Sequence, residues 1–267
     1  MKNKKITVLD FKKKKVSGEK ITMLTAYDCP MARVIDDAGI DAVLVGDSLG
    51  MVVLGYDSTT KVTMDEMIHH AKAVRNGISR AFLIGDMPFM SYQASDEDAV
   101  RNAGRFVQES GCEAVKIEGG KDITARIKAI IGAGIPVLGH VGLQPQSVNK
   151  TGGYRVQGKD ALSSGDLIKD AVELEKAGCF AVVLECVPKE LAKKITARLT
   201  IPTIGIGAGM FCDGQVLVTH DILGYFSDHT PKFIKKYANI APLIKNAVES
   251  FKQETVSGVF PDDERSY

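Results

Sequence analysis

Short apolar runs rich in β-branched residues alternate with longer amphipathic segments along most of the chain. Eight of the short runs are predicted as strands: Ile21–Ala26, Ala42–Val45, Ala81–Ile84, Ala114–Ile117, Ile135–Leu138, Ala181–Leu184, Pro202–Ile206 and Gln215–Val218. Helical periodicity predicts the helices between them: Cys29–Ala38, Met64–Asn76, Asp96–Ser110, Asp122–Gly132, Ser164–Ala177 and Pro188–Arg198. Capping residues support these bounds, since Thr63 and Ser95 precede acidic first turns and Gly111 and Gly178 follow helix ends.

This alternation predicts a parallel sheet, because parallel strands need a crossover connection that is usually a helix. Eight such units favour an α/β fold of the (β/α)8 TIM-barrel type. A doubly wound open sheet is the alternative. Its dinucleotide fingerprint is missing, since the glycine run Gly205–Gly209 is too compact for G-x-G-x-x-G. No linker or change of composition divides the chain, so we expect one barrel domain over residues 1–267.

Both ends of the chain are expected to add helices to the barrel. The start, MKNKKITVLDFKKKK, is basic and lacks the apolar stretch of a signal peptide. It predicts a short amphipathic helix capped at Thr7, with Val8 and Phe11 turned inward. Binding of polyanions by its lysines is a second interpretation. A helical tail is expected from about Pro231 to Glu254.

Composition and charge exclude several classes of protein. Lysine and arginine number 34 against 33 acidic residues, so no overall field attracts nucleic acid or an anionic membrane. Tryptophan is absent, which leaves little surface for stacking on bases. No run approaches the roughly 18 apolar residues of a membrane span. The five cysteines are odd in number and show no C-x-x-C spacing, which indicates a reduced, cytoplasmic protein without a cysteine zinc site.

Ionisable residues accompany the ends of five consecutive predicted strands. They are Asp47, Asp86, Lys116 with Glu118, His140, and Glu185. The active site of a barrel lies at the carboxyl ends of its strands. A single aspartate at such a position often only caps the following loop, but five endings in succession favour a shared site.

Two pairs among these residues point to particular chemistry. Asp47 and Asp86 are expected to converge on one cation, because neighbouring strands lie about 4.8 Å apart and Mg²⁺ is usually held by one or two carboxylates. Loop capping is the alternative. Lys116 and Glu118 face the same side of one strand. They form a structural ion pair, or Lys116 binds a substrate carboxylate.

Three further features keep more than one interpretation. Glu185 shares the inward face of its strand with Ala181 and Val183, which makes it a candidate for proton transfer. His140 is a metal ligand, a hydrogen-bond partner of a substrate oxygen, or a buried structural histidine. Gly205–Gly209 binds a phosphate through its N–H groups or makes a tight crossing over the barrel mouth.

Eight segments, in one order, resemble a known family. They are TAYD (Thr25–Asp28), VGDSLGMVVLGYDST (Val45–Thr59), DMPFMSY (Asp86–Tyr92), VKIEGG (Val115–Gly120), GHVGLQPQSVN (Gly139–Asn149), GGY (Gly152–Tyr154), LECVP (Leu184–Pro188) and IPTIGIGAG (Ile201–Gly209). From about Ile21 to Ile244 the sequence is similar to the ketopantoate (3-methyl-2-oxobutanoate) hydroxymethyltransferase family. One departure is Thr60-Lys61, where Leu-Pro is frequent in the family.

The resemblance implies a barrel of the phosphoenolpyruvate/pyruvate type, in a cytoplasmic homodecamer. It implies transfer of a hydroxymethyl group from 5,10-methylenetetrahydrofolate to 3-methyl-2-oxobutanoate, which forms 2-dehydropantoate for pantothenate and coenzyme A biosynthesis. By motif position, Asp47, Asp86 and Glu118 match the carboxylates that bind one Mg²⁺ per subunit. Asp47 and Asp86 also match residues of the substrate site.

The same comparison assigns roles to four more residues. Ser48 and Lys116 match contacts of the keto acid, Glu185 matches the proton acceptor, and His140 matches a histidine that lines the site. This agrees with the chemistry of a 2-oxo acid, which chelates Mg²⁺ through its carboxylate and keto oxygens. The cation then stabilises the enolate that forms when C3 loses a proton. The enolate would then attack the folate methylene carbon.

Two other functions compete with this one. A folate-independent 2-oxo acid lyase or mutase of the same superfamily would share the metal and the enolate, so dependence on folate separates the two. A catalytically silent binding or assembly protein would lack a charged residue at one or more strand ends, and none is missing.

Overall fold

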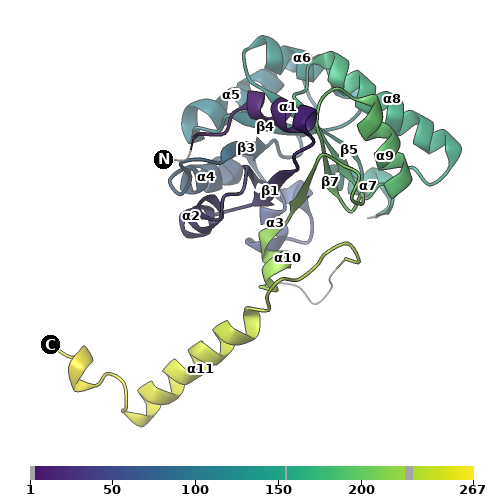
Figure 1. The fold of residues 1–267 in the computed structure, drawn as a ribbon. Coiled ribbons are helices and arrows are strands. Elements are labelled where there is room, and N and C mark those ends of the chain that lie inside the picture. Colours follow the sequence, from purple (N-terminus) through teal and green to yellow (C-terminus); the bar gives the residue numbers. More distant parts are fainter. Residues whose placement is uncertain (1–3, 154, 226–230) are drawn as a thin grey trace. The chain divides into compact units, whose positions relative to one another are not determined.

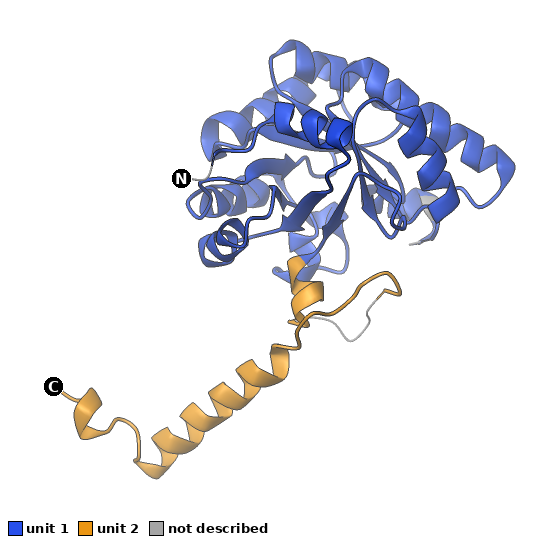
Figure 2. Ribbon diagram, viewed as in Figure 1, with its two compact units in different colours: residues 1–218 blue, residues 219–267 orange. Residues whose placement is uncertain are grey.

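The chain forms two compact units in the computed structural model, which describes residues 4–153, 155–225 and 231–267 (Figures 1 and 2). The first unit is Met1–Val218 and the second is Thr219–Tyr267. The expectation of one domain over residues 1–267 stays a prediction. Tyr154, the last residue of the GGY segment, lies outside the described residues.

The first unit is built on a closed barrel of parallel strands. They are β1 (Ile21–Thr25), β2 (Ala42–Val45), β3 (Phe82–Asp86), β4 (Ala114–Glu118), β5 (Val137–Gly142), β6 (Ala181–Glu185), β7 (Thr203–Ile206) and β8 (Gly214–Leu217). Each strand pairs in parallel with the next, and β8 pairs with β1, which closes the sheet. The predicted barrel is confirmed, and the open sheet is excluded.

Helices surround the barrel, as Figure 1 shows. They are α1 (Val8–Ser17), α2 (Cys29–Asp37), α3 (Leu49–Val52), α4 (Met64–Arg75), α5 (Asp96–Ser110), α6 (Thr124–Gly132), α7 (Val148–Thr151), α8 (Ala161–Ala177) and α9 (Lys189–Arg198). Three short 3₁₀ turns, η1 (Thr59–Lys61), η2 (Lys121–Ile123) and η3 (Pro145–Ser147), lie in the connections. The single-turn helices α3 and α7 were not predicted, because one turn is too short to show helical periodicity.

Several predicted boundaries shift by one or two residues, and two in the barrel unit shift further. Strand β5 was expected over Ile135–Leu138 but runs from Val137 to Gly142, so that His140 lies within the strand. Helix α8 begins three residues before the predicted Ser164, because the Asp160 carboxylate caps it by accepting the N–H of Ser163 at 2.9 Å.

Alternate residues of the strands feed two separate apolar clusters. Val115 and Ile117 belong to the cluster between the strands and the helices, whereas Ala181 and Val183 belong to the cluster inside the barrel. Because side chains alternate along a strand, Glu185 shares the inward face with Ala181 and Val183, as predicted.

Helix α1 contributes to the interior cluster through Phe11, which is 1% exposed. Its ring packs edge-on against Phe82 at 5.5 Å and Phe180 at 5.2 Å between ring centres. The predicted cap is present, since the Asp10 carboxylate accepts the N–H of Thr7 at 2.9 Å. The helix thus packs where β3 begins and just before β6, at the end of the barrel opposite the predicted site.

The second unit contains α10 (Thr219–Leu223), α11 (Ala241–Ser257) and the 3₁₀ turn η4 (Asp263–Arg265). Helix α11 begins about ten residues later than the expected tail, with a proline in its first turn, where the missing N–H costs no hydrogen bond. It ends at Ser257 and is capped by Gly258, whose φ of 72° suits glycine. Among the described residues, no helix combines the length and apolar character needed to cross a membrane.

Candidate active site

The strand register brings the predicted strand-end residues side by side at the carboxyl end of the barrel. Asp86, the last residue of β3, pairs with Lys116 on β4, and Glu118 pairs with His140 on β5. These four side chains and Asp47, which follows β2, are buried, with exposures between 1% and 5%. The barrel therefore shields these five side chains from bulk water.

Lys116 is the buried cation at the centre of this group. Its Nζ lies 2.6 Å from Oδ1 of Asp86 and 3.5 Å from Oε1 of Glu118. The other oxygen of Asp86 accepts the main-chain N–H of Asp47 at 3.2 Å. The structural ion pair anticipated for Lys116 is therefore present, and its principal partner is Asp86 on the neighbouring strand.

His140 stands between two carboxylates. Its Nδ1 lies 3.6 Å from Oε1 of Glu118, and its Nε2 lies 3.2 Å from Oε2 of Glu185. Burial and the Lys116 charge would each lower the pKa of the imidazole, but the two carboxylates outweigh them and raise it to about 9. His140 therefore carries a positive charge near neutral pH and contacts the proposed proton acceptor directly.

The cluster holds more carboxyl groups than cationic side chains. Burial, followed by repulsion from Asp86, raises the pKa of Asp47 well above its usual range. Burial also raises the pKa of Asp86, although the Lys116 charge opposes this. Burial acts the same way on Glu118, yet Lys116 and His140 overcome it and lower its pKa. A bound cation would stabilise the ionised forms of these buried carboxyl groups.

The residues present fit a hydrated divalent cation better than a closed metal cage. In the described part of the chain, no three histidine, cysteine, aspartate or glutamate side chains are placed to ligate one ion. Mg²⁺ usually keeps several waters and takes one or two carboxylates, which Asp47 and Asp86 supply. Oε1 of Glu118 is buried without a hydrogen-bond partner. A Cβ built on Gly46 would lie 2.9 Å from Oγ of Ser48 and 3.8 Å from Oδ2 of Asp86, so the absence of a side chain leaves room for the Ser48 hydroxyl beside Asp86.

Ser48 follows Asp47 directly and is the N-cap residue of the short helix α3. Its hydroxyl lies 2.8 Å from the hydroxyl of Tyr27, and the carbonyl of Tyr27 lies 2.7 Å from Nδ1 of His70. Tyr27 belongs to the TAYD segment, but its role was not foreseen. The contact of Ser48 with the keto acid stays a prediction.

Gln146 is the principal residue that the sequence analysis missed. Its side-chain amide donates to Oδ2 of Asp47 and to the carbonyl of Met87, both at 2.9 Å. Its main-chain N–H donates to Oε2 of Glu118 at 3.1 Å, and its Oε1 accepts the hydroxyl of Tyr92 at 2.8 Å. One residue thus contacts two of the predicted metal-binding carboxylates, Asp47 through its side chain and Glu118 through its main chain. Membership of the GHVGLQPQSVN segment was its sequence signal.

The glycine run after β7 makes a close approach to other chain segments. Gly207 and Gly209 have φ values of 64° and 79°. A Cβ on Gly209 would lie 2.6 Å from Cβ of Lys189, the first residue of α9. The carbonyl of Gly209 accepts the side-chain amide of Gln215 at 2.9 Å. Close packing therefore explains why glycines occupy these positions. Of the two interpretations of Gly205–Gly209, it favours a tight crossing over the barrel mouth and not a phosphate-binding loop.

Comparison with known proteins places the chain in a family. The sequence profile of ketopantoate hydroxymethyltransferase matches residues 5–263. The chain belongs to this family. A 3-methyl-2-oxobutanoate hydroxymethyltransferase of Acetivibrio thermocellus is 57% identical over 265 residues, which cover 99% of this chain and 94% of that protein. One of Syntrophus aciditrophicus is 55% identical, covering 100% of this chain and 98% of that protein.

Solved structures with low sequence identity support the fold of this family member. A 2,3-dimethylmalate lyase of the PEP mutase/isocitrate lyase superfamily aligns with a TM-score of 0.61 at 17% identity, covering 97% of this chain and 91% of that one. A phosphonopyruvate hydrolase aligns with a TM-score of 0.64 at 12% identity, covering 97% and 93%. These likenesses show the same barrel fold, and the phosphoenolpyruvate/pyruvate type stays a prediction.

Proposed function

We propose that this protein transfers a hydroxymethyl group from 5,10-methylenetetrahydrofolate to 3-methyl-2-oxobutanoate and forms 2-dehydropantoate for pantothenate synthesis. The observation that carries the proposal is the buried cluster of Asp47, Asp86, Lys116, Glu118 and His140, with Glu185 beside it, in a member of this family. The cluster offers a binding place for a cation and an ammonium group that can pair with the carboxylate of the substrate. It also offers a protein carboxylate that can accept a proton.

Mg²⁺ would be held by Asp47 and Asp86, and Glu118, the third carboxylate of the predicted set, lies beside them without completing a three-ligand group among the described residues. When bound, it would polarise the carboxylate and keto oxygens of the 2-oxo acid and so make the C3 proton more acidic. Its charge would also offset the excess of carboxylates over cations in a region with little access to water.

Lys116 binds the carboxylate of the keto acid, because its ammonium is buried at the centre of the cluster and is held in place by Asp86. Ser48 contributes its hydroxyl to the same substrate. Glu185 accepts the C3 proton at its side-chain oxygens. The imidazolium of His140, 3.2 Å from Oε2, holds that carboxylate in position.

Removal of the proton leaves C3 nucleophilic, and it then bonds to the one-carbon unit of the folate. The overall reaction consumes one water, whose oxygen becomes the new hydroxyl group, and releases tetrahydrofolate. Burial of the cluster limits competing protonation of C3 by bulk water.

The deciding experiment supplies purified protein with 3-methyl-2-oxobutanoate, 5,10-methylenetetrahydrofolate and Mg²⁺, and omits one component at a time. We expect 2-dehydropantoate only in the complete mixture. Consumption of the keto acid without folate would instead support the lyase or mutase function. The homodecamer and the cytoplasmic location belong to this proposal, and sedimentation velocity and cell fractionation test them.

A further inference from the structure

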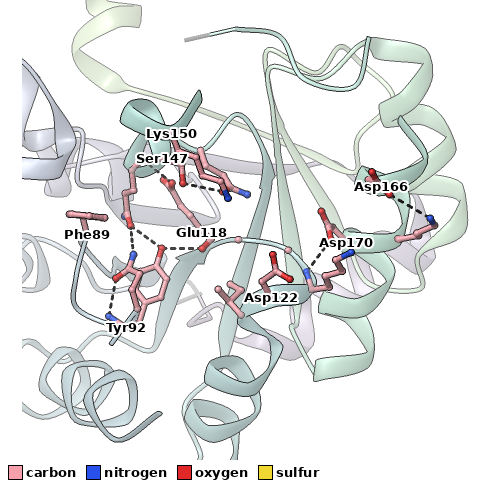
Figure 3. Close-up of a pocket in the computed structure, with 16 residues that line it drawn as sticks. Phe89, Tyr92, Glu118, Asp122, Ser147, Lys150, Asp166 and Asp170 are labelled. Atoms are coloured by element: carbon pink, nitrogen blue, oxygen red, sulfur yellow. Dashed lines mark hydrogen bonds and ion pairs between the residues drawn. The ribbon is translucent and has the colours of Figure 1, made fainter. Parts of the chain in front are cut away.

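The carboxylate proposed as the proton acceptor is held through its main chain as well as by His140. Glu118, on the other side of His140, is held in a comparable way, because its main-chain carbonyl accepts the hydroxyl of Tyr92 at 3.0 Å (Figure 3). Glu185 is the last residue of β6, and main-chain groups beside both adjacent strands hold it. A general base acts only within hydrogen-bond reach of the proton that it takes, so the placement of this main chain affects the rate.

The peptide unit between Glu185 and Cys186 is fixed on both sides. Its carbonyl accepts the N–H of Leu143, which follows β5, at 2.8 Å, and its N–H donates to the carbonyl of Ile206, the last residue of β7, also at 2.8 Å. The carbonyl of Cys186 then accepts the N–H of Gln157 at 2.9 Å. The main chain that carries the carboxylate is therefore bonded to three other segments.

Gly142 lets β5 approach this peptide unit closely. Its φ is 97°, and it pairs with Glu185 in the strand register. A Cβ built on Gly142 would lie 2.3 Å from the carbonyl oxygen and 3.1 Å from the main-chain nitrogen of Glu185. It would also lie 2.8 Å from Cγ2 of Val187, which is buried in the close-packed cluster outside the barrel. A side chain at residue 142 would therefore push β5 and β6 apart at Glu185.

Cys186 ends the strand directly after the carboxylate by adopting a left-handed backbone. Its φ is 49°, a conformation that residues other than glycine adopt only at a cost. Burial, followed by the charge of Glu185, raises the pKa of the Cys186 thiol to about 11, so the thiol stays protonated near pH 7 and is a poor base. The unusual feature of this residue is its backbone, and strained backbone often occurs beside reacting groups.

We propose that Gly142 and Cys186 are positioning residues for the general base, and that they hold the main chain of Glu185 so that its carboxylate stays against His140 and within reach of the substrate carbon. The inference rests on the proposed function and adds the residues that place its base. Displacement of a reacting group by about 1 Å can lower a rate on the order of 10²-fold. Both residues should affect proton removal and hardly affect binding of Mg²⁺ or keto acid, whose predicted ligands lie on or directly after β2, β3 and β4.

Gly142→Ala tests the close approach. In the Mg²⁺-loaded protein, we expect exchange of the C3 proton of 3-methyl-2-oxobutanoate with D₂O to slow ~10²-fold, while the dissociation constants for Mg²⁺ and the keto acid do not change.

Gly134→Ala is the matched control for this variant. Gly134 also has a positive φ, of 87°, and lies just before β5, but a Cβ there would have nothing within 4 Å. The control therefore introduces a similar backbone strain without touching Glu185, and it should exchange at the parental rate. Parental exchange in a folded Gly142→Ala protein, or an equal loss in Gly134→Ala, would overturn the role of Gly142.

Two substitutions of nearly equal size test the backbone of residue 186, and they do so even if Gly142→Ala fails to fold. Asparagine adopts the left-handed region more readily than most residues, whereas threonine is branched at Cβ and avoids it. Cys186→Asn should keep the parental exchange rate, and Cys186→Thr should lose about 10-fold in rate without a change in keto-acid affinity. Equal rates in the two variants would overturn the role of Cys186.

The position of the carboxylate can be measured apart from turnover. Crystal structures of the parent, Gly142→Ala and Cys186→Thr should show the separation between Oε2 of Glu185 and Nε2 of His140 lengthening in both variants from 3.2 Å to beyond hydrogen-bond distance. An unchanged separation would overturn the proposal whatever the activity. Failure of the parent to form 2-dehydropantoate would refute the proposed function, whereas these structures would still decide the positioning.

Discussion

The side-chain amide of Gln146 donates a hydrogen bond to Asp47 over 2.9 Å, although the two residues are 99 positions apart in the chain. The main-chain N–H of Gln146 holds Glu118, and Tyr92 holds the oxygen of its amide. Gln146 therefore fixes two carboxylates relative to each other. Groups that orient metal-binding carboxylates in this way commonly change metal affinity when they are replaced.

Gln146→Met should weaken Mg²⁺ binding about 10- to 100-fold, because Asp47 loses its donor while the side-chain volume is nearly kept. The dissociation constant can be measured calorimetrically with Mg²⁺, or by electron paramagnetic resonance with Mn²⁺. Gln108→Met, on the exposed side of α5, is the control. Parent-like affinity in a folded Gln146→Met protein would contradict this role.

Asp47→Asn and Asp86→Asn should each lower turnover by several orders of magnitude and weaken Mg²⁺ binding while the fold survives. In Mg²⁺-free buffer, Asp47→Asn should melt at or above the temperature of the parent, because one of two repelling buried carboxylates is removed. Added Mg²⁺ should stabilise the parent and not the variant. Near-parental turnover of either variant at limiting Mg²⁺ would refute the metal assignment.

Lys116→Met should lower the free energy of unfolding by about 3–5 kcal/mol, because it leaves Asp86 buried without its cation. Lys116→Met/Asp86→Asn should recover much of that stability. Neither variant should bind the keto acid normally, which an equilibrium binding measurement would show. Normal keto-acid affinity in the stable double variant would leave Lys116 with a structural role alone.

Glu185→Gln should slow exchange of the C3 proton with D₂O by about 10²–10⁴-fold, the usual contribution of a general base. Glutamine keeps the shape of the side chain but cannot accept the proton. Binding of Mg²⁺ and keto acid should persist, since Asp47, Asp86 and Lys116 are unchanged. Exchange at the parental rate, followed by NMR, would mean that another residue is the base.

Asp36→Ala should lower the free energy of unfolding by about 2–4 kcal/mol at pH 7. The Asp36 carboxylate accepts the N–H groups of Ser79, Arg80 and Ala81 ahead of β3. Burial alone would raise the pKa of Asp36, but these hydrogen bonds outweigh it and lower the pKa below its usual range.

The pH dependence of Asp36 follows from that direction. Its stabilisation is complete above the unfolded pKa of about 3.9 and is lost as the pH falls through the lower folded value. Urea unfolding should therefore show the difference between parent and Asp36→Ala shrinking in acid. Asp37→Asn, the exposed neighbour, is the control, and a difference that stays constant to pH 2 would contradict the assignment.

Much of the fold was predictable because the determining information is local. Alternation within β4 placed Lys116 and Glu118 on one face, and helical period and caps placed α5 at its observed bounds. The chain order of strands gave the barrel, since consecutive parallel strands are joined by helices. Boundaries were missed where a tertiary contact decided them, as in β5, which extends to pair Gly142 with Glu185.

The sequence by itself determined which residues reach the carboxyl end of the barrel, because strand parity and strand order are properties of the chain. Only the tertiary structure decided which groups touch: Lys116 with Asp86, His140 with Glu185, and Gln146 with Asp47. Those contacts depend on strand register and on the path of long loops, which local sequence does not encode. The charge states of the buried groups depend on these contacts in turn, since burial and neighbouring charges set each pKa.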